Sequence, residues 1–289
     1  MHPFRTSLRC RHRHDVPEHT LLALVVCAAA AAAGCGGPRK DTRPQPSLEH
    51  MVFVPAGEFT MGRDHEDSDE SPVRRVWLDA FYIDRTEVTN AQFKAFCDAT
   101  GRLYTNNPHW DDDYFLGKPD YPVINITYDQ ARAYCAWANK RLPTEAEWEK
   151  AARGTEGQLY PWGNEWTEQV ANLWGDQGEQ DHFRRTAPVG SFPAGASPYG
   201  AVDMVGNVWE WCADWFDEDY YSRAPNRNPP GPAEPTPWRV VRGGGFSSPL
   251  RPTGDTVVSN RSKNHPMQPI HHLGCRCAWS PADASRPER

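Results

Sequence analysis

The sequence lacks a basic stripe with interleaved aromatic residues. Its 38 acidic residues outnumber its 31 basic residues, and the formal net charge is −7. Proteins that bind a phosphate backbone carry clustered Lys and Arg side chains, because these side chains displace the counterions of the nucleic acid. No such cluster occurs here, so nucleic acid is not an expected partner.

Long hydrophobic runs are also missing. The apolar run at residues 21–33 is too short to cross a bilayer, which takes about 20 residues. The chain has no Gly-rich phosphate loop and no internal repeat, and Ser247 and Ser248 have no recognisable His and acid partners. These absences exclude a membrane-spanning anchor, a nucleotide-binding loop, a repeat architecture and a serine-hydrolase triad.

The chain is rich in Trp, Gly and Pro, with 12, 22 and 27 residues respectively. Its 289 residues are 38% hydrophobic, which is enough apolar material for a folded core. Many turn formers and large aromatic side chains favour a loop-rich domain over a helical bundle or a regular parallel sheet. Because no linker divides residues 51–280, we expect a single domain.

The first 35 residues have the features of an export signal. A positively charged start is followed by the apolar run and by Ala33-Gly34-Cys35, and the charged residues are Arg5, Arg9, Arg11 and Arg13. Small residues before a cysteine resemble a lipobox, in which Cys35 becomes the acylated N-terminus, carrying chains such as palmitate. A signal simply cleaved after the Ala-rich run is the alternative. Gly36, rather than Asp, favours the outer membrane, and residues 36–49 are expected to form a flexible tether.

Three segments begin with a helix-start signal, a Thr followed three residues later by Gln or Glu, which forms a capping box. The pairs are Thr89 with Gln92, Thr127 with Gln130, and Thr144 with Glu147. We expect a short helix after each Thr, the first ending at Gly101. Strand-like runs occur at Met51–Val54, Val76–Ile83 and Trp238–Val241, whereas residues 154–237 are mostly turn formers and aromatics.

A series of short blocks carries the most specific signal. They are Met51–Phe59 with Met61-Gly62, Phe81–Asp84 with Glu87–Asn90, Lys140–Glu149, Tyr160–Gly163, Gly206–Trp211, Arg242–Gly244 and Leu273–Cys277. In this order they resemble the formylglycine-generating enzyme (sulfatase-modifying factor) family. The resemblance implies an irregular, loop-rich α+β domain with a C-type lectin-like fold at residues 50–282, followed by a tail at 283–289. The family includes binding modules without known chemistry, so the fold alone does not choose a function.

The resemblance also implies two structural calcium sites, made of the oxygen ligands that this ion prefers. The first would use the side chains of Asn172 and Asp181 and the carbonyls of Leu173 and Phe183; the second would use the side chains of Asp203 and Glu210 and the carbonyls of Gly206 and Val208. Asp203 stands where the family usually has Asn, which keeps an oxygen donor. The alternatives are that Asn172 and Asp181 cap turns and that Glu210 pairs with an Arg.

Five cysteines follow Cys35, namely Cys97, Cys135, Cys212, Cys275 and Cys277. In an oxidising compartment they should pair where geometry permits. A disulfide of the family's eukaryotic enzymes implies a bridge between Cys135 and Cys277. Since the other three cannot all pair, one free or intermolecular thiol is expected among them.

Active members of the family bind copper(I) through two cysteines and oxidise a substrate cysteine, in a Cys-x-Pro-x-Arg peptide, to formylglycine. One cysteine follows an Arg-Gly-Gly-Ser-Trp turn and the second lies five residues later. Here the turn reads Arg-Gly-Gly-Gly-Phe from Arg242, and the two positions fall on Ser248 and about Thr253. Hydroxyls are poor ligands for this soft ion. No cysteine lies between Cys212 and Cys275, so we expect neither copper nor the family's catalytic residues.

Two functions remain open. The first is a lipid-anchored binding or scaffold module of the bacterial envelope, whose loops at 106–118 and 217–236 would contact an envelope protein, a peptide or a glycan. Its contact residues would be Trp110, Tyr114, Trp215, Tyr220 and Tyr221, unless these pack beneath the loops. The second is an oxidoreductase of the same superfamily with a relocated metal site, for example at Cys212 and Cys275. His265, His271 and His272 are more typical of solvated loop histidines than of a metal site.

Overall fold

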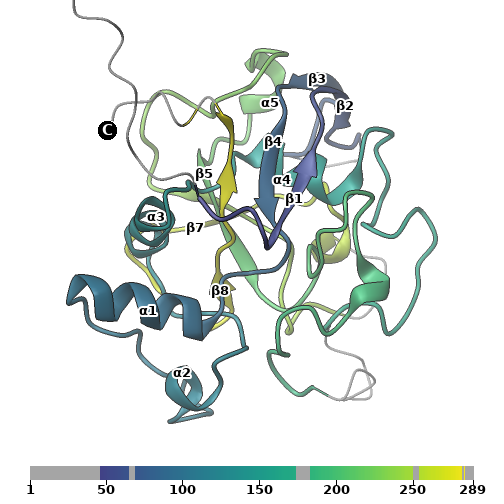
Figure 1. The fold of residues 1–289 in the computed structure, drawn as a ribbon. Helices are drawn as coiled ribbons and strands as arrows, with labels where there is room; N and C mark the ends of the chain where they lie inside the picture. The colour runs from purple at the N-terminus through teal and green to yellow at the C-terminus, as the bar shows by residue number, and fades with distance from the viewer. Residues whose placement is uncertain (1–45, 65–68, 174–182, 250–253, 282, 284–289) are drawn as a thin grey trace, which may run out of the picture. The chain divides into compact units, whose positions relative to one another are not determined.

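The computed structural model describes residues 46–64, 69–173, 183–249, 254–281 and 283, within a unit that spans residues 41–289. Cys35 and the predicted export signal lie outside the described residues, and so do Asp181 and Thr253. In the described part, no helix is long and apolar enough to cross a membrane. The fold is of the predicted α+β class, with short helices, short strands and long loops (Figure 1).

The first sheet joins strands from opposite ends of the sequence. Strand β1 (Met51–Val54) pairs antiparallel with β4 (Phe81–Asp84), and β4 pairs antiparallel with β9 (Ala278–Trp279). Between β1 and β4, strands β2 (Gly57–Met61) and β3 (Arg74–Leu78) form an antiparallel pair of their own. The run predicted as one strand at Val76–Ile83 is therefore two strands in different sheets, divided at Asp79 and Ala80.

The second sheet has the order β7-β6-β5-β8. Its strands are β5 (Trp209–Trp215), β6 (Arg239–Arg242), β7 (Ser262–Asn264) and β8 (Leu273–Gly274). The central strand β5 pairs antiparallel with β6 and parallel with β8. The sequence pattern missed β5 because Glu210 and Asp214 interrupt its apolar character, although both side chains are buried.

All three capping boxes are confirmed. They start α1 (Asn90–Thr100), α3 (Tyr128–Trp137) and α4 (Glu145–Arg153), and in each the Thr side chain and the Gln or Glu side chain accept from each other's backbone N–H. Gly101 ends α1 with a φ of 68°, a conformation that glycine adopts without steric cost. Two single-turn helices, α2 (Tyr114–Gly117) and α5 (Tyr220–Arg223), lie at opposite ends of the unit in Figure 1.

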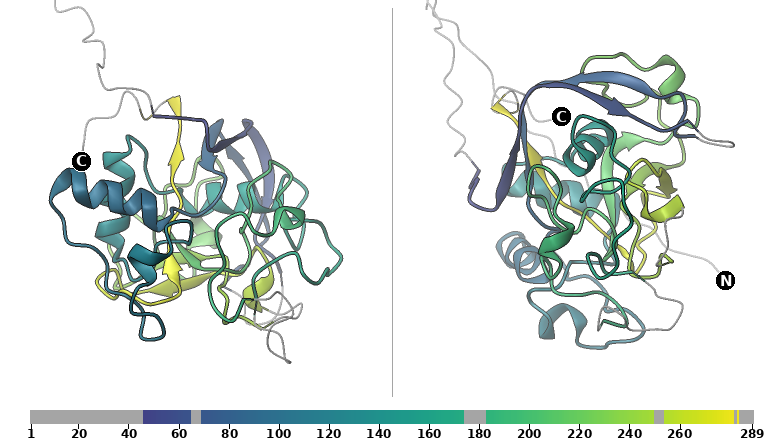
Figure 2. Two further views of the ribbon diagram at one scale, coloured as in Figure 1. Left: turned by 60° about the horizontal axis from the view of Figure 1, so that its bottom comes forward. Right: turned by 90° about the vertical axis from the view of Figure 1, so that its right-hand side faces the viewer.

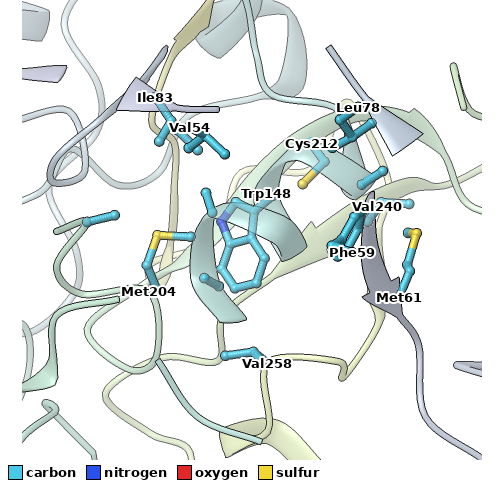
Figure 3. Packing of buried hydrophobic residues seen from close by; sticks show 14 of the residues in the cluster. Val54, Phe59, Met61, Leu78, Ile83, Trp148, Met204, Cys212, Val240 and Val258 are labelled. Carbon is cyan, nitrogen blue, oxygen red and sulfur yellow. The ribbon is translucent and has the colours of Figure 1, made fainter. Parts of the chain in front are cut away.

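Trp148 of α4 is at the centre of the first hydrophobic core. The core gathers Val54, Phe59, Ile83, Met204 and Val240 around this indole, as Figure 3 shows. A second core contains one face each of α1 and α3, together with Trp211 of β5 and Leu273 of β8. Among the described residues between α4 and β5, the regular element is the 3-10 turn Pro193–Gly195, and the rest forms loops (Figure 2).

Candidate functional site

The turn after β6 places Ser248 where the family resemblance predicts the first copper cysteine. Ser248 is only 3% exposed. Its hydroxyl accepts from the Gly245 backbone N–H at 3.2 Å and lies 3.2 Å from the Asp255 carboxylate, to which it donates. Gly244 has a φ of 72°, and a Cβ there would lie 2.6 Å from the Asp255 carbonyl oxygen. The turn is therefore tightly built, and both hydrogen-bonding roles of the Ser248 hydroxyl are used within the protein.

An aromatic and imidazole cluster lies beside this turn. The Trp110 ring is 5.6 Å from the Phe246 ring and 4.8 Å from the His271 ring, and His271 is 5.1 Å from His272. The Arg185 guanidinium lies over Trp110 at 5.1 Å. We call Trp110, Arg185, Phe246, His271 and His272 the aromatic surface. Phe246 is buried, and the other four are partly exposed.

Burial lowers the pKa of both His271 and His272, and neighbouring basic side chains lower it further. For His271 the neighbours are His109 and Arg185, and for His272 the neighbour is His271. At neutral pH the two imidazoles are therefore uncharged and can both donate and accept hydrogen bonds. His265 is elsewhere, against Trp238.

The structure brings only part of the predicted contact surface together. Trp110 belongs to the aromatic surface, but Tyr114, Tyr220 and Tyr221 are at most 8% exposed and pack in the cores. Trp215 is partly exposed and stacks under the Arg239 guanidinium at 3.4 Å. For the three tyrosines, packing beneath the loops was the correct alternative, because each loop turns its tyrosine rings inward.

The two loops predicted to contact a partner lie against different parts of the molecule. Residues 106–110 reach the aromatic surface through His109 and Trp110. The loop at 217–236 is held against β3 instead, since the Trp77 backbone bonds Asn226 and Asn228 and its ring stacks with Arg227.

The first predicted calcium site is described in part. The Asn172 side chain is buried, and its Nδ2 donates to the Arg185 carbonyl and to Asn207 Oδ1. Its Oδ1 is buried without a hydrogen-bond donor among the described residues. A buried carbonyl oxygen without a donor is costly, and a cation would satisfy it. Asn172 thus fits a cation ligand, while Asp181 lies outside the described residues.

At the second predicted site, Glu210 is paired with an arginine. Both Glu210 and Arg276 are 0% exposed; Arg276 donates to the two carboxylate oxygens at 2.7 Å, and the Trp148 indole N–H donates to one of them at 2.8 Å. The negative charge of Glu210 is therefore already balanced. Asp203 accepts from the Gly190 N–H at 2.6 Å. Calcium at this position stays a prediction.

Glu87 is a buried acid that sequence reasoning did not single out. It is 1% exposed; one oxygen accepts from Asn207 at 3.0 Å, and the other has no donor among the described residues. Burial raises its pKa well above the usual value, and the nearby Asp203 adds to the effect. Glu87 and Asp203 thus supply negative charge that Arg276 does not balance, and either protons or a cation must offset it.

The cysteines fall into separate groups. Cys135 and Cys277 lie in the second core with their sulfur atoms 2.8 Å apart and without a covalent bond, so the predicted bridge stays a prediction. Cys212 packs in the first core and Cys275 in the second. Among the described residues, no group of three or more His, Cys, Asp or Glu side chains is arranged to hold a metal ion. The arrangement gives no specific support to a metal site built from Cys212 and Cys275.

A groove of about 610 Å³ lies along α3, on residues that the sequence gave no reason to select. One helix face contributes Tyr128, Arg132 and Ala136, and the facing wall includes Pro229 and Pro230. Its size suits a small ligand or a short peptide segment.

Comparison with known proteins identifies the fold and then the family. The solved structure of PvdO from Pseudomonas aeruginosa superposes with a TM-score of 0.68 at 28% identity, covering 80% of this chain and 94% of that one. Residues 38–281 match the sulfatase-modifying factor enzyme 1-like domain. The formylglycine-generating enzyme of Thermomonospora curvata is 36% identical, over 84% of this chain and 97% of that protein. The chain therefore belongs to the formylglycine-generating enzyme (sulfatase-modifying factor) family.

A further relative comes from Bos taurus and is named inactive C-alpha-formylglycine-generating enzyme 2. It is 33% identical, over 82% of this chain and 89% of that protein.

Proposed function

We propose that this chain is a lipid-anchored binding module of the bacterial cell envelope that has given up the copper chemistry of its family. The observation that carries the proposal is Ser248. A hydroxyl stands where the family resemblance expects a thiolate, and it is buried and hydrogen-bonded to Gly245 and Asp255. Copper(I) selects thiolates over hydroxyls, so this position is a poor ligand for it. A relative named as inactive supports such a loss within the family.

The aromatic surface would contact the partner. Trp110, His271 and His272 are partly exposed side chains with few rotatable bonds, and they pack against one another through ring contacts of 4.8 and 5.1 Å. Side chains that are already ordered lose little entropy on binding, and aromatic rings dominate many interfaces. The proposed partner is a peptide, a glycan or another envelope protein.

Calcium would act as a structural ion in this module. Asn172 offers a buried oxygen without a donor, and Glu87 and Asp203 are buried carboxyl groups with raised pKa values, whose protons a cation would replace. The loops between α4 and β5 have little regular structure, so an ion that links them would stabilise the folded state.

A copper and turnover assay tests the loss of catalysis. Full-length protein is incubated with copper(I), oxygen, a reductant and a Cys-x-Pro-x-Arg peptide, with the Thermomonospora curvata enzyme as the positive control. We expect no copper binding at equimolar metal and no conversion of the peptide thiol to an aldehyde. Multiple-turnover aldehyde formation would overturn the proposal.

A matched variant tests whether Ser248 and Thr253 are the reason that the wild type does not bind copper(I). Ser248→Cys with Thr253→Cys restores two thiols at the family positions, and we expect it to bind copper(I) where the wild type does not. Ser248→Ala with Thr253→Ala is the control that changes the same positions without adding thiols. If the cysteine variant also fails to bind copper while remaining folded, residues other than Ser248 and Thr253 are responsible.

A further inference from the structure

Three buried thiols meet in the second core. Cys135 on α3 has its sulfur 2.8 Å from that of Cys277, and Cys275 packs in the same buried cluster as both. All three residues are 0% exposed. Cys275 and Cys277 are two residues apart between β8 and β9, and their carbonyls both accept from one neighbouring segment, from Val88 N–H and Asp84 N–H. This alternation is that of an extended chain, in which both side chains point to the same side of the backbone. Cys135 therefore has two possible disulfide partners.

Arg276 fixes this segment from the opposite side. Its guanidinium holds Glu210 through two bonds of 2.7 Å and donates to the backbone carbonyls of Val202 and Asp203. Because Arg276 is held in this way, the residues on either side of it, Cys275 and Cys277, keep their positions and both face α3. Choosing one partner or the other does not require the ion pair to break.

We propose that Cys135, Cys275 and Cys277 form an intramolecular thiol–disulfide exchange site, in which Cys135 is bonded to either of the other two. A disulfide such as oxidised glutathione forms the first bond. Two protein thiols each lose one electron and one proton, and the glutathione disulfide is reduced to two thiols. In the exchange step, the thiolate of the free cysteine attacks the Cys135 sulfur. The new S–S bond forms as the old one breaks, and the displaced sulfur leaves as a thiolate that takes up the proton.

The other two cysteines do not take part. The Cys97 thiol contacts the Leu103 carbonyl oxygen at 3.5 Å, and Cys212 packs beside Trp148 in the first core (Figure 3). The odd thiol of the three-cysteine group is therefore held next to the disulfide that it attacks. Burial raises the pKa of Cys277 to about 12, so its thiolate is scarce at neutral pH, and attack by Cys277 on a Cys135–Cys275 bond should be slow there and faster in alkaline solution.

Peptide mapping separates the two isomers directly. Trypsin cuts after Arg276, which places Cys275 on the peptide 264–276 and Cys277 on the peptide 277–289, while Cys135 is on 133–140. Full-length protein is oxidised with glutathione disulfide, alkylated at acidic pH to stop exchange, digested and analysed without reduction. Wild type should give both cross-linked pairs. Their ratio should be the same whether fully reduced protein is oxidised at pH 9 or one separated isomer is incubated at pH 9.

Single variants decide whether both bonds can form. Cys277→Ser should give only the Cys135–Cys275 pair, and Cys275→Ser only the Cys135–Cys277 pair. Cys212→Ser is the control and should leave the wild-type mixture unchanged. Folded Cys277→Ser protein whose Cys135 and Cys275 are both alkylated as free thiols would overturn the proposal. So would a wild-type protein that shows one isomer only, both after oxidation and after incubation at pH 9; this second result does not depend on the folding of any variant.

Discussion

Arg276 and Glu210 form a fully buried, bidentate ion pair, with both N–O distances at 2.7 Å and both side chains 0% exposed. The pair joins β5 to the segment between β8 and β9. Arg276 also donates to the carbonyls of Asp84, the last residue of β4, and of Arg85, which follows it. One guanidinium thus ties the two sheets together.

Removing Arg276 should be strongly destabilising. Arg276→Met leaves the Glu210 carboxylate buried without its counter-charge, beside Glu87 and Asp203, and breaking a buried pair in this way costs about 3–5 kcal/mol. The control is Arg75→Met, which breaks the exposed pair with Glu58 and should cost about 1 kcal/mol or less. The free energies of unfolding come from denaturant titration. Equal losses for the two variants would show that burial does not set the strength of the Arg276 pair.

Calcium should stabilise the protein through Asn172. A ligand that binds only the folded state adds about 2.7 kcal/mol of stability at a concentration of 100 times its Kd. We expect a chelator to lower the melting temperature of the wild type, and Asn172→Ala to shrink this calcium-dependent difference. Asn226→Ala, which removes a side-chain acceptor for Arg74, is the control and should keep the full difference. The calcium site would be refuted if the protein contains no calcium and its melting temperature changes neither with chelator nor with added calcium.

The helices could be predicted from sequence because their signals are local. A Thr and a Gln or Glu three residues apart satisfy each other's backbone donors whatever surrounds them, and all three boxes are formed. The central strand β5 could not be predicted from sequence, because its buried Glu210 is balanced by Arg276, 66 residues further along the chain. Likewise, nothing local shows that Tyr220 turns inward while Trp110 stays partly exposed.

The candidate site, like the fold, could be predicted only where its signal is local in the sequence. The position of Ser248 follows from the motif after β6, but its bond to Asp255 depends on how the next turn folds back. Glu87 carries no signal as a single acid in a helix-start motif. Only the fold places it next to Asp203 and Asn207.

Cys35→Ala should release the protein from membranes. The predicted lipoprotein signal ends at Cys35, and several acyl chains on one residue anchor far more firmly than a single chain. Wild-type protein should fractionate with outer membranes and carry the mass of its acyl chains, whereas the variant should lack both properties. Wild-type protein that mass spectrometry finds unlipidated and cleaved before residue 35 would favour the plain export signal.

Asp214 should make the protein less stable as the pH rises. Burial, together with the charge of Glu145, raises the Asp214 pKa to about 8, and its Oδ2 accepts from the Glu145 backbone N–H at 2.8 Å. Between about pH 4, where the carboxyl titrates in the unfolded chain, and about pH 8, the folded protein holds a proton that the unfolded chain has lost. Unfolding therefore releases a proton, and stability from this group falls with rising pH until about pH 8.

Asp214→Asn isolates this contribution. The amide oxygen can still accept from Glu145, but it has no charge to bury, so the variant should gain stability relative to wild type as the pH rises from 5 to 8. The upper limit of the gain is about 1.4 kcal/mol per pH unit. Glu87 and Asp203, whose pKa values are raised in the same direction, act equally in both proteins and cancel in the difference. Free energies of unfolding at pH 5, 6, 7 and 8 provide the comparison, and parallel curves for the two proteins would mean that Asp214 does not hold a proton in the folded state.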